Sequence, residues 1–322
     1  MKRLYRILYL LPLVATLAAN AQMIDNTVGF KNINSDKYFR LNYENDFFSA
    51  TDIYYTQGIN LEIVAPWARH FILSKALLHP RGWYTRYGIG IEHNGYTPTS
   101  IGHDEILHGD RPFGGTLALK TFQISIDTTR RQRLSTTLYT GILGAAAGTA
   151  EMQTGIHRWL HNIRPRGWPN QIHNDAVLDY EVDYEKQIFS LGRYLLLDVD
   201  ARACIGTLRD NAGVGSTLYF GYYDSPYDII TSNARNFRIY GYEHAGFNAI
   251  GYDATLQGGL FNRSSPYTIP TADITRGTFE NRFGFVVMYR RISLEYFQSF
   301  LSPEFSTGKM HVWGGIQIAF GL

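Results

Sequence analysis

The sequence lacks three features that would place it in common classes of protein. It has a single cysteine, Cys204, among 322 residues, so no intramolecular disulfide can form, and we interpret this thiol as a small apolar strand residue rather than a nucleophile. The 30 Lys and Arg nearly balance the 28 Asp and Glu, which leaves no basic surplus for nucleic acid. No apolar run reaches the roughly 20 residues that a membrane-spanning helix needs. These absences exclude a disulfide scaffold, a nucleic-acid-binding protein and a helical membrane protein.

Residues 1–21 have the pattern of a secretory signal peptide. Lys2, Arg3 and Arg6 precede an apolar run over 7–18, and a small-x-small cleavage site, Ala-Asn-Ala, follows at 19–21. We therefore expect the chain to be exported and this segment to be removed.

The remaining chain is rich in aromatic residues and glycine. The sequence has 23 Tyr, 19 Phe, 5 Trp and 31 Gly, yet its mean hydropathy is -0.19. An outer-membrane β-barrel combines these properties, because its strands alternate apolar residues that face lipid with polar residues that face the interior. We predict that residues 22–322 form one all-β domain, an antiparallel transmembrane β-barrel in the outer membrane of a Gram-negative bacterium.

Alternation is clear in strands that lie far apart in the sequence. In 177–186 and 195–203, apolar residues alternate with Asp, Glu or Arg, and 312–322 is apolar at every second position to the last residue. Alternation alone does not separate a barrel from a soluble sandwich. A charged face shared by distant strands in an exported, aromatic-rich chain favours the barrel, with lipid on the apolar face.

Alternation and turn signals predict thirteen strands in all. The other ten lie near 38–46, 57–65, 85–95, 114–126, 134–144, 216–224, 236–248, 252–261, 279–289 and 292–300. A closed single-chain barrel needs an even number. One segment is therefore false or two should merge, and the glycine-rich region 236–261 is where we expect the error.

Counting strands up and down brings several polar motifs to one rim of the barrel. If the first strand leaves the periplasm, it delivers Asn45 and Asp46 to the extracellular rim. The segments 96–113 and 145–175 reach the same rim by the same count. We expect an active site there, facing the outer leaflet.

The loop 145–175 contains a predicted helix. Residues 145–161 favour a helix by propensity, and Gln153 and His157 stand four apart on one face, with His161 extending the row. Apolar residues of the same helix, including Trp159, are available to pack on the barrel wall or to meet acyl chains.

Five short motifs now occur in one order and spacing. Along the chain they are Glu44-Asn45-Asp46 with Tyr55-Thr56-Gln57-Gly58, Tyr96-Thr97-Pro98, Gly109-Asp110-Arg111-Pro112, Gln153 with His157, and Gly167-Trp168-Pro169-Asn170-Gln171. In this series the chain resembles the outer-membrane lipid A 3′-O-deacylase family from residue 38 to about 187. A looser likeness, which includes Glu304-Phe305 and Gly308, continues toward the C-terminus.

The resemblance implies a twelve-stranded barrel with a calcium-dependent site between the barrel wall and a helix of an extracellular loop. The implied reaction is hydrolysis of the ester that holds the 3′-linked acyloxyacyl group on lipid A. His157 would be the general base that activates water, while Thr56 and Gln153 would orient groups by hydrogen bonds. Asn45 and Asp46 would offer oxygen ligands, which a hard cation such as Ca²⁺ prefers.

Lipid A carries phosphates, so cationic and hydrogen-bonding residues are expected beside the site. The candidates for substrate binding are Arg111, Arg158, Arg164, Trp168 and Gln171. The segment after the predicted helix offers no acidic ligand, which leaves Asp175 or a backbone carbonyl as a further ligand of the metal.

The expected partners are lipid A, as lipopolysaccharide of the outer leaflet, and the barrel-assembly machinery, which would recognise the apolar terminal strand. We expect a monomer that binds no nucleic acid.

Other readings remain open from the sequence. Asn45-Asp46 is compatible with ordinary turn chemistry, His157 with a solvated helix residue, and Trp168 with interfacial packing. Asp110 and Arg111 are compatible with a structural salt bridge at the rim. A different outer-membrane lipid hydrolase acting on glycerophospholipids, and a barrel without enzymatic activity, are the alternative functions. No Gly-x-Ser-x-Gly motif supports a serine nucleophile.

Overall fold

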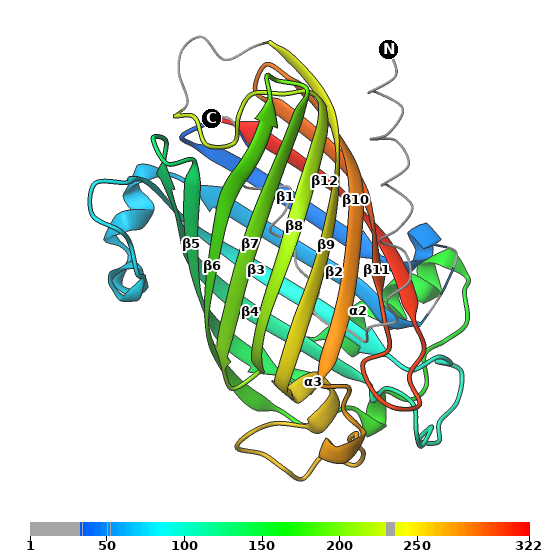
Figure 1. Cartoon of the computed structure of the whole chain (residues 1–322). Coiled ribbons are helices and arrows are strands. Elements are labelled where there is room, and N and C mark those ends of the chain that lie inside the picture. Colours follow the sequence, from blue (N-terminus) through cyan, green and yellow to red (C-terminus); the bar gives the residue numbers. More distant parts are fainter. Residues whose placement is uncertain (1–32, 34, 50, 52, 230–235) are drawn as a thin grey trace.

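A closed barrel of twelve antiparallel strands forms the body of the protein (Figure 1). The computed structural model describes residue 33, residues 35–49, residue 51, and residues 53–229 and 236–322. The predicted signal peptide lies outside these residues. The strands are β1 (Tyr38–Asn45), β2 (Tyr54–Val64), β3 (Tyr84–Thr97), β4 (Gly114–Asp127), β5 (Gln132–Leu143), β6 (Asp175–Leu191), β7 (Leu195–Gly206), β8 (Arg209–Tyr222), β9 (Phe237–Asp253), β10 (Gly277–Tyr289), β11 (Ile292–Leu301) and β12 (His311–Gly321).

The strands follow one another around the barrel in chain order, and β1 closes it by pairing with β12. This pairing runs from Tyr38 opposite Gly321 to Asn45 opposite Gly314. The predicted barrel is therefore confirmed, and so is the even count of twelve strands that the resemblance implied.

The predicted strand at 252–261 is wrong. β9 continues to Asp253, and the short helix α3 (Ala254–Gln257) starts directly after it. The Asp253 carboxylate accepts a hydrogen bond of 2.8 Å from the Thr255 amide, which is the usual capping interaction at a helix N-terminus. Gly258 ends the helix with a φ of +82°, a conformation that favours glycine.

The predicted helix at 145–161 is real but shorter. Residues Ala145–Ala147 form a separate 3-10 turn, η5, because Gly148 adopts a left-handed conformation and starts the helix α2 at Thr149–Leu160. His161 also adopts a left-handed conformation, with φ 55°, so it ends the helix instead of extending the row of Gln153 and His157. The other short helices are the 3-10 turns η2 (Asp46–Ser49), η3 (Pro66–His70), η4 (Ile72–Ala76), η6 (Trp168–Asn170) and η7 (Thr271–Asp273).

None of the helices in the described part of the chain is long and apolar enough to cross a membrane.

The interior of the barrel is polar and its outer wall is apolar, as the alternation predicted. In the interior, Glu62 of β2 pairs with Arg40 of β1, and its other oxygen lies 2.8 Å from Lys120 Nζ of β4. All three side chains are buried. On the wall, residues such as Leu178 and Val199 are exposed. The charged side chains of 177–186 thus point inward, where ion pairs and hydrogen bonds compensate their burial.

The two ends of the barrel differ. One end carries α2, α3 and the long loops, and we call it the α2 rim (Figure 1). The opposite end, which we call the turn end, carries the starts of β1, β3 and β5, the end of β12 and the turns between strands. Asn45 and Asp46 lie at the α2 rim, because β1 starts at the turn end and finishes with Asn45.

We predict that Glu62→Gln destabilises the barrel, because it removes the carboxylate that forms ion pairs with both Arg40 and Lys120. Breaking a buried ion pair from one side costs about 3–5 kcal/mol. The measurement is the temperature at which the folded, fast-migrating form is lost in gel electrophoresis. Asp104→Asn is the control, since its 3.3 Å pair with Arg166 is exposed to solvent and exposed pairs contribute about 0–1 kcal/mol. Equal melting of the two variants would contradict the prediction.

Candidate active site

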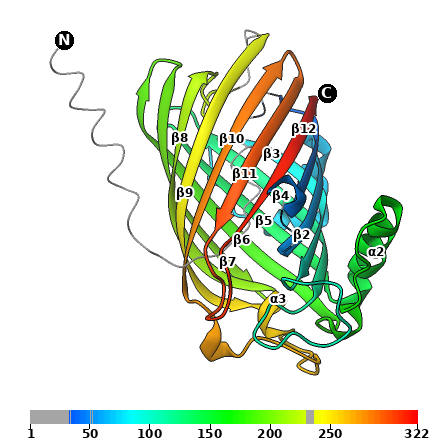
Figure 2. The same ribbon diagram turned by 90° about the vertical axis from the view of Figure 1, so that its right-hand side faces the viewer.

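Helix α2 stands beside the outer wall of the barrel rather than over its opening (Figure 2). The residue before Gly148, Ala147, places its carbonyl oxygen 3.1 Å from His93 Nε2 of β3, and the same nitrogen lies 3.0 Å from Thr149 Oγ1. His93 belongs to the outward-facing set of β3, since Glu92 next to it pairs with Lys120 in the interior. The start of α2 is therefore fixed to the wall by β3.

Two glycines allow the close approach of α2. Gly95 of β3 and Gly115 of β4 are paired across the two strands, and both face the first residue of the helix. A Cβ at Gly115 would lie 2.0 Å from Thr149 Oγ1, and one at Gly95 would lie 2.7 Å from Thr149 Cγ2. We call Gly95 and Gly115 the glycine notch. Any larger residue at either position would push the helix away from the wall.

The polar face of α2 is hydrogen-bonded to the strand ends. Gln153 Nε2 donates to Thr56 Oγ1 at 3.0 Å, and Gln153 Oε1 accepts from Trp168 Nε1 at 2.7 Å. On the other side of Thr56, its carbonyl oxygen accepts from Asn45 Nδ2 at 2.6 Å. Residues from β1, β2, α2 and the 165–171 segment are thus joined in one continuous network.

His157 lies one helical turn beyond Gln153 on the same face, and it is largely buried. Its Nδ1 lies 2.7 Å from the carbonyl oxygen of Ile163. A carbonyl only accepts hydrogen bonds, so Nδ1 must carry the proton in this contact. In the neutral ring, Nε2 is then the basic nitrogen, and the loop after α2 fixes both the tautomer and the ring plane.

Asn45 and Asp46 differ in their surroundings. Asn45 Oδ1 accepts from the Phe47 amide at 2.7 Å, so the side chain is held by hydrogen bonds at both ends of its amide. Asp46 follows as the first residue of η2, and it is almost fully buried. The turn chemistry considered for Asn45 from the sequence is therefore present, and it fixes the position of the next residue.

The donor atoms at the end of β1 and the start of β2 suit a hard cation. Among the described residues, no three His, Cys, Asp or Glu side chains converge as a metal site. The candidate donors at the strand ends are oxygens: the Asp46 carboxylate, the Asn45 amide oxygen and the Thr56 hydroxyl. Oxygen-only donors fit Ca²⁺ better than zinc, and a single carboxylate leaves part of a shell of six to eight ligands to carbonyls, water or substrate.

The predicted substrate-binding residues fall into two groups. Arg158 of α2 and Arg164, which follows the helix, are exposed. Trp168 is buried against Phe113, with ring centroids 5.0 Å apart, so it positions Gln153 from behind. Gln171 is partly buried in the segment after Trp168, where its Oε1 is enclosed. A substrate contact of Trp168 is not favoured by this placement.

Arg111 is buried in the loop packing. Its guanidinium pairs with Glu304, donates to Thr255 Oγ1 at 2.6 Å and lies 4.4 Å from the centre of the Tyr96 ring. Burial alone would lower the pKa of Arg111, but the Glu304 and Asp253 carboxylates raise it, so the group remains charged. This placement favours a role in joining the rim loops over direct contact with a phosphate.

Two carboxylates considered from the sequence have structural roles. Asp110 does not pair with the Arg111 guanidinium; it accepts hydrogen bonds from the amides of Thr99 and Arg111. Asp175 accepts from the amides of Phe261 and Asn262 at 2.7 and 3.0 Å, and so ties β6 to the β9–β10 loop. This placement favours a structural role for Asp175 over the role of metal ligand that the sequence left open.

Apolar side chains surround the site on the outside of the barrel. Phe47 of η2 is 78% exposed and Trp159 of α2 is 77% exposed, and Leu160 and Ile163 are exposed next to them. The predicted helix included Trp159 among its apolar residues, whereas Phe47 and Ile163 were not predicted from the sequence. The position of Phe47 directly after Asn45-Asp46 was the available signal. An aromatic residue at this strand end does not fit the polar interior and is therefore expected on the outside of the barrel.

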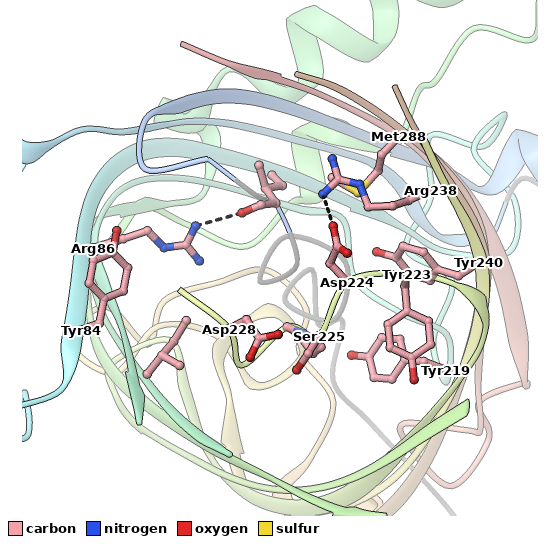
Figure 3. A pocket seen from close by; sticks show the side chains of 13 residues that line it. Tyr84, Arg86, Tyr219, Tyr223, Asp224, Ser225, Asp228, Arg238, Tyr240 and Met288 are labelled. Carbon is pink, nitrogen blue, oxygen red and sulfur yellow. Dashed lines mark hydrogen bonds and ion pairs between the residues drawn. The ribbon is translucent and has the colours of Figure 1, made fainter. Parts of the chain in front are cut away.

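A separate pocket lies at the turn end, inside the barrel (Figure 3). Its lining includes four tyrosines and two arginines, Arg86 and Arg238. Arg238 Nη1 lies 3.3 Å from Asp224 Oδ2, and Arg86 Nη1 donates to the Ile33 carbonyl at 3.0 Å. None of the predicted site residues contributes to this pocket, so it is no part of the candidate active site.

The closed, even-numbered antiparallel barrel with an apolar wall and a polar interior defines an outer-membrane β-barrel protein. More narrowly, the chain belongs to the family described as outer membrane protein LpxR, whose model matches residues 7–322. The family resemblance inferred from the five motifs is thereby confirmed.

Solved structures are similar to this chain over most of its length. LpxR from Salmonella typhimurium superposes with a TM-score of 0.72 at 18% identity, covering 88% of this chain and 100% of that one. The β domain of the Bordetella autotransporter BrkA gives 0.48 at 10% identity, covering 90% and 100%. An outer membrane channel from Pseudomonas putida F1 gives 0.47 at 9% identity, covering 92% and 99%. A comparison with curated proteins gives no match.

We predict that Gly115→Val detaches α2 while leaving the barrel closed, because valine suits a strand but fills the glycine notch. The measurement is the rate of trypsin cleavage after Arg158, which should rise roughly tenfold if local opening becomes easier by about 1.4 kcal/mol. Gly155→Ala is the control, since nothing lies within 4 Å of an added Cβ there. Unchanged cleavage of the folded Gly115→Val protein would refute the role of the notch.

Proposed function

We propose that this protein is an outer-membrane esterase that hydrolyses the 3′-linked acyloxyacyl group of lipid A. The observation that carries the proposal is the network on the outer wall, in which Asn45, Thr56 and Gln153 are joined by hydrogen bonds and His157 lies one turn away. A base and a set of hard oxygen donors on the lipid-facing side suit an ester buried in a membrane. Membership of the LpxR family supports the same substrate.

In the proposed reaction, His157 Nε2 accepts a proton from water, and the water oxygen attacks the ester carbonyl. The Ile163 carbonyl stabilises the imidazolium through the Nδ1 proton. The same proton can then pass from Nε2 to the sugar oxygen as the ester bond breaks, which yields a free fatty acid and an alcohol.

Gln153 and Thr56 position the reacting groups. Because Gln153 Nε2 donates to Thr56 Oγ1, the Thr56 hydroxyl proton is left to donate elsewhere in the site. Trp168 fixes the orientation of the Gln153 amide, since an indole nitrogen only donates and therefore selects the oxygen. The tryptophan is thus a positioning residue.

Asp46 and Asn45 are the residues that would hold Ca²⁺, with the Asp46 carboxylate as the charged ligand. Bound there, the ion would supply electrostatic stabilisation of the negative charge that develops on the carbonyl oxygen. The exposed Arg158 and Arg164 are the candidates for contact with lipid A phosphates, and Phe47 and Trp159 for contact with acyl chains. Contact of these residues with lipid A of the outer leaflet requires that the α2 rim faces the outside of the cell.

We predict that His157→Ala abolishes deacylation of lipid A, because general-base catalysis typically contributes about 10²–10⁴ in rate. The measurement is mass spectrometry of lipid A and of glycerophospholipids from cells that express the protein. The mass of the 3′-linked acyloxyacyl group should be lost from lipid A with the wild type and retained with His157→Ala.

The matched control for this variant is His161→Asn, an exposed histidine at the end of the same helix whose left-handed conformation asparagine tolerates. It should deacylate like the wild type. Loss of fatty acids from phospholipids alone would favour the phospholipase alternative, and unchanged lipids with folded wild type would favour a barrel without enzymatic activity.

We predict that EGTA abolishes the activity, that Ca²⁺ restores it and that Mg²⁺ does not, because Mg²⁺ demands stricter octahedral geometry. Asp46→Asn should raise the Ca²⁺ concentration for half-maximal activity by roughly tenfold or more, as loss of a charged ligand weakens binding. Asp104→Asn, an exposed carboxylate elsewhere on the rim, is the control. Activity that persists in EGTA would show that the reaction does not need calcium. The role of His157 is tested separately by His157→Ala.

A further inference from the structure

The connection between β2 and β3, residues 65–83, has an unusual charge pattern. The chain has no Asp or Glu from residue 63 to residue 91. Within 65–83 it carries Arg69, Lys75 and Arg81, two histidines, and the aromatic residues Trp67, Phe71 and Trp83. We call this segment, which contains η3 and η4, the 65–83 belt.

The belt folds back along the outside of the barrel (Figure 1, light blue). Its anchor is the main chain around Leu78. The Leu78 amide donates to Tyr180 Oη of β6 at 2.8 Å, and the same hydroxyl donates to the Ala76 carbonyl at 3.1 Å. The Leu78 carbonyl accepts from Thr136 Oγ1 of β5 at 3.2 Å and also from Gln123 Nε2 of β4. Three successive strands therefore hold the belt against the wall.

The wall beneath the belt carries polar side chains, in contrast to the apolar residues that cover most of the outer surface. Thr121, Gln123 and Ser125 of β4 alternate with Lys120, Phe122 and Ile124, which lie in the interior. They consequently point outward, and yet they are fully buried, as is Thr136 of β5. Polar side chains exposed to hydrocarbon are unfavourable. The belt and its hydrogen bonds remove these residues from lipid.

The outer surface of the belt combines apolar and cationic side chains. Trp67 is 51% exposed, Ile72 is 66% exposed and Leu78 is 57% exposed, and Arg69, Lys75 and Arg81 are exposed between them. Segments that lie in a membrane interface have this composition: apolar and aromatic residues enter the acyl region while Lys and Arg stay with the head groups. The apolar residues of the belt continue the apolar wall of the barrel.

We propose that the 65–83 belt binds the head groups of anionic phospholipids around the turn end of the barrel. The surplus of cations without any neighbouring carboxylate in the segment selects a negatively charged surface. Because the belt lies on the outside of the wall, it faces the lipids of the leaflet that surrounds the turn end. The proposal is independent of the deacylase activity, because the belt and α2 lie at opposite ends of the barrel.

The test uses the full-length protein in vesicles in which a small fraction of the lipid has brominated acyl chains, which quench tryptophan on contact. The brominated lipid is either phosphatidylglycerol, which is anionic, or phosphatidylcholine, which is zwitterionic, at equal mole fraction. The signal of Trp67 is the difference between the wild type and Trp67→Phe. At low salt, brominated phosphatidylglycerol should quench this signal at least about twofold more strongly, because the belt enriches anionic lipid beside Trp67.

The variant that tests the head-group contact is Arg69→Gln, Lys75→Gln and Arg81→Gln combined. In this variant, the two brominated lipids should quench the Trp67 signal equally. The matched control is Arg130→Gln, Arg193→Gln and Arg291→Gln, which removes the same charge from three other turns of the same end and should keep the preference.

A second measurement needs no substitution. Raising the salt concentration from 50 to 500 mM should remove most of the preference of the wild type, because screening weakens the attraction between exposed cations and head groups. Equal quenching by the two lipids at low salt would overturn the proposal, as would a preference that survives in the belt variant or in high salt. No quenching by either lipid would show that the belt does not touch the bilayer, and would overturn it as well.

Discussion

The structure depends on the pairing of β1 with β12. In contact with hydrocarbon, each backbone amide and carbonyl has to find its partner within the protein, and a sheet satisfies this condition only when it closes. Once it is closed, alternation sends every second side chain inward, where Arg40 and Lys120 form ion pairs with Glu62 and Glu92. The interior is thereby filled with its own charged groups. The candidate chemistry consequently lies outside the barrel, between α2 and the wall.

The placement of α2 shows how much a fold of this kind relies on small residues at a few points. The helix reaches the wall because Gly95 and Gly115 lie side by side, and it is oriented because His93 and Thr56 project outward from β3 and β2. The belt at the other end follows the same principle, since outward polar residues of β4 and β5 hold a segment that would otherwise leave the surface. Both attachments are exceptions to the apolar outer wall, and each marks a place where a chain segment covers it.

The sequence predicted the barrel and the gathering of Asn45, Thr56 and Gln153 at one end of it, because these features depend on alternation and on the order of motifs. It did not predict where β9 ends, because Gly246, Gly251 and Asp253 are compatible with either a strand or a turn. The structure shows that Asp253 ends β9 and caps α3. The role of Arg111 was equally hidden. Its partner Glu304 is almost two hundred residues away, and only the closed barrel brings them together. The outward polar residues under the belt were missed because alternation assigns them to the lipid face without indicating what covers them.

The position of the candidate site on the outer wall determines which concentration of a lipid substrate is relevant to the protein. His157 and Gln153 lie on the face of α2 that meets the barrel, and Phe47 and Trp159 are exposed, so the lipid substrate of the proposed function would reach the site by lateral diffusion within its leaflet. Encounter is then a two-dimensional process, governed by the mole fraction of the lipid and by the fluidity of its neighbours. Packing of the leaflet, rather than the amount of lipid in the suspension, sets the rate at which such a site is filled.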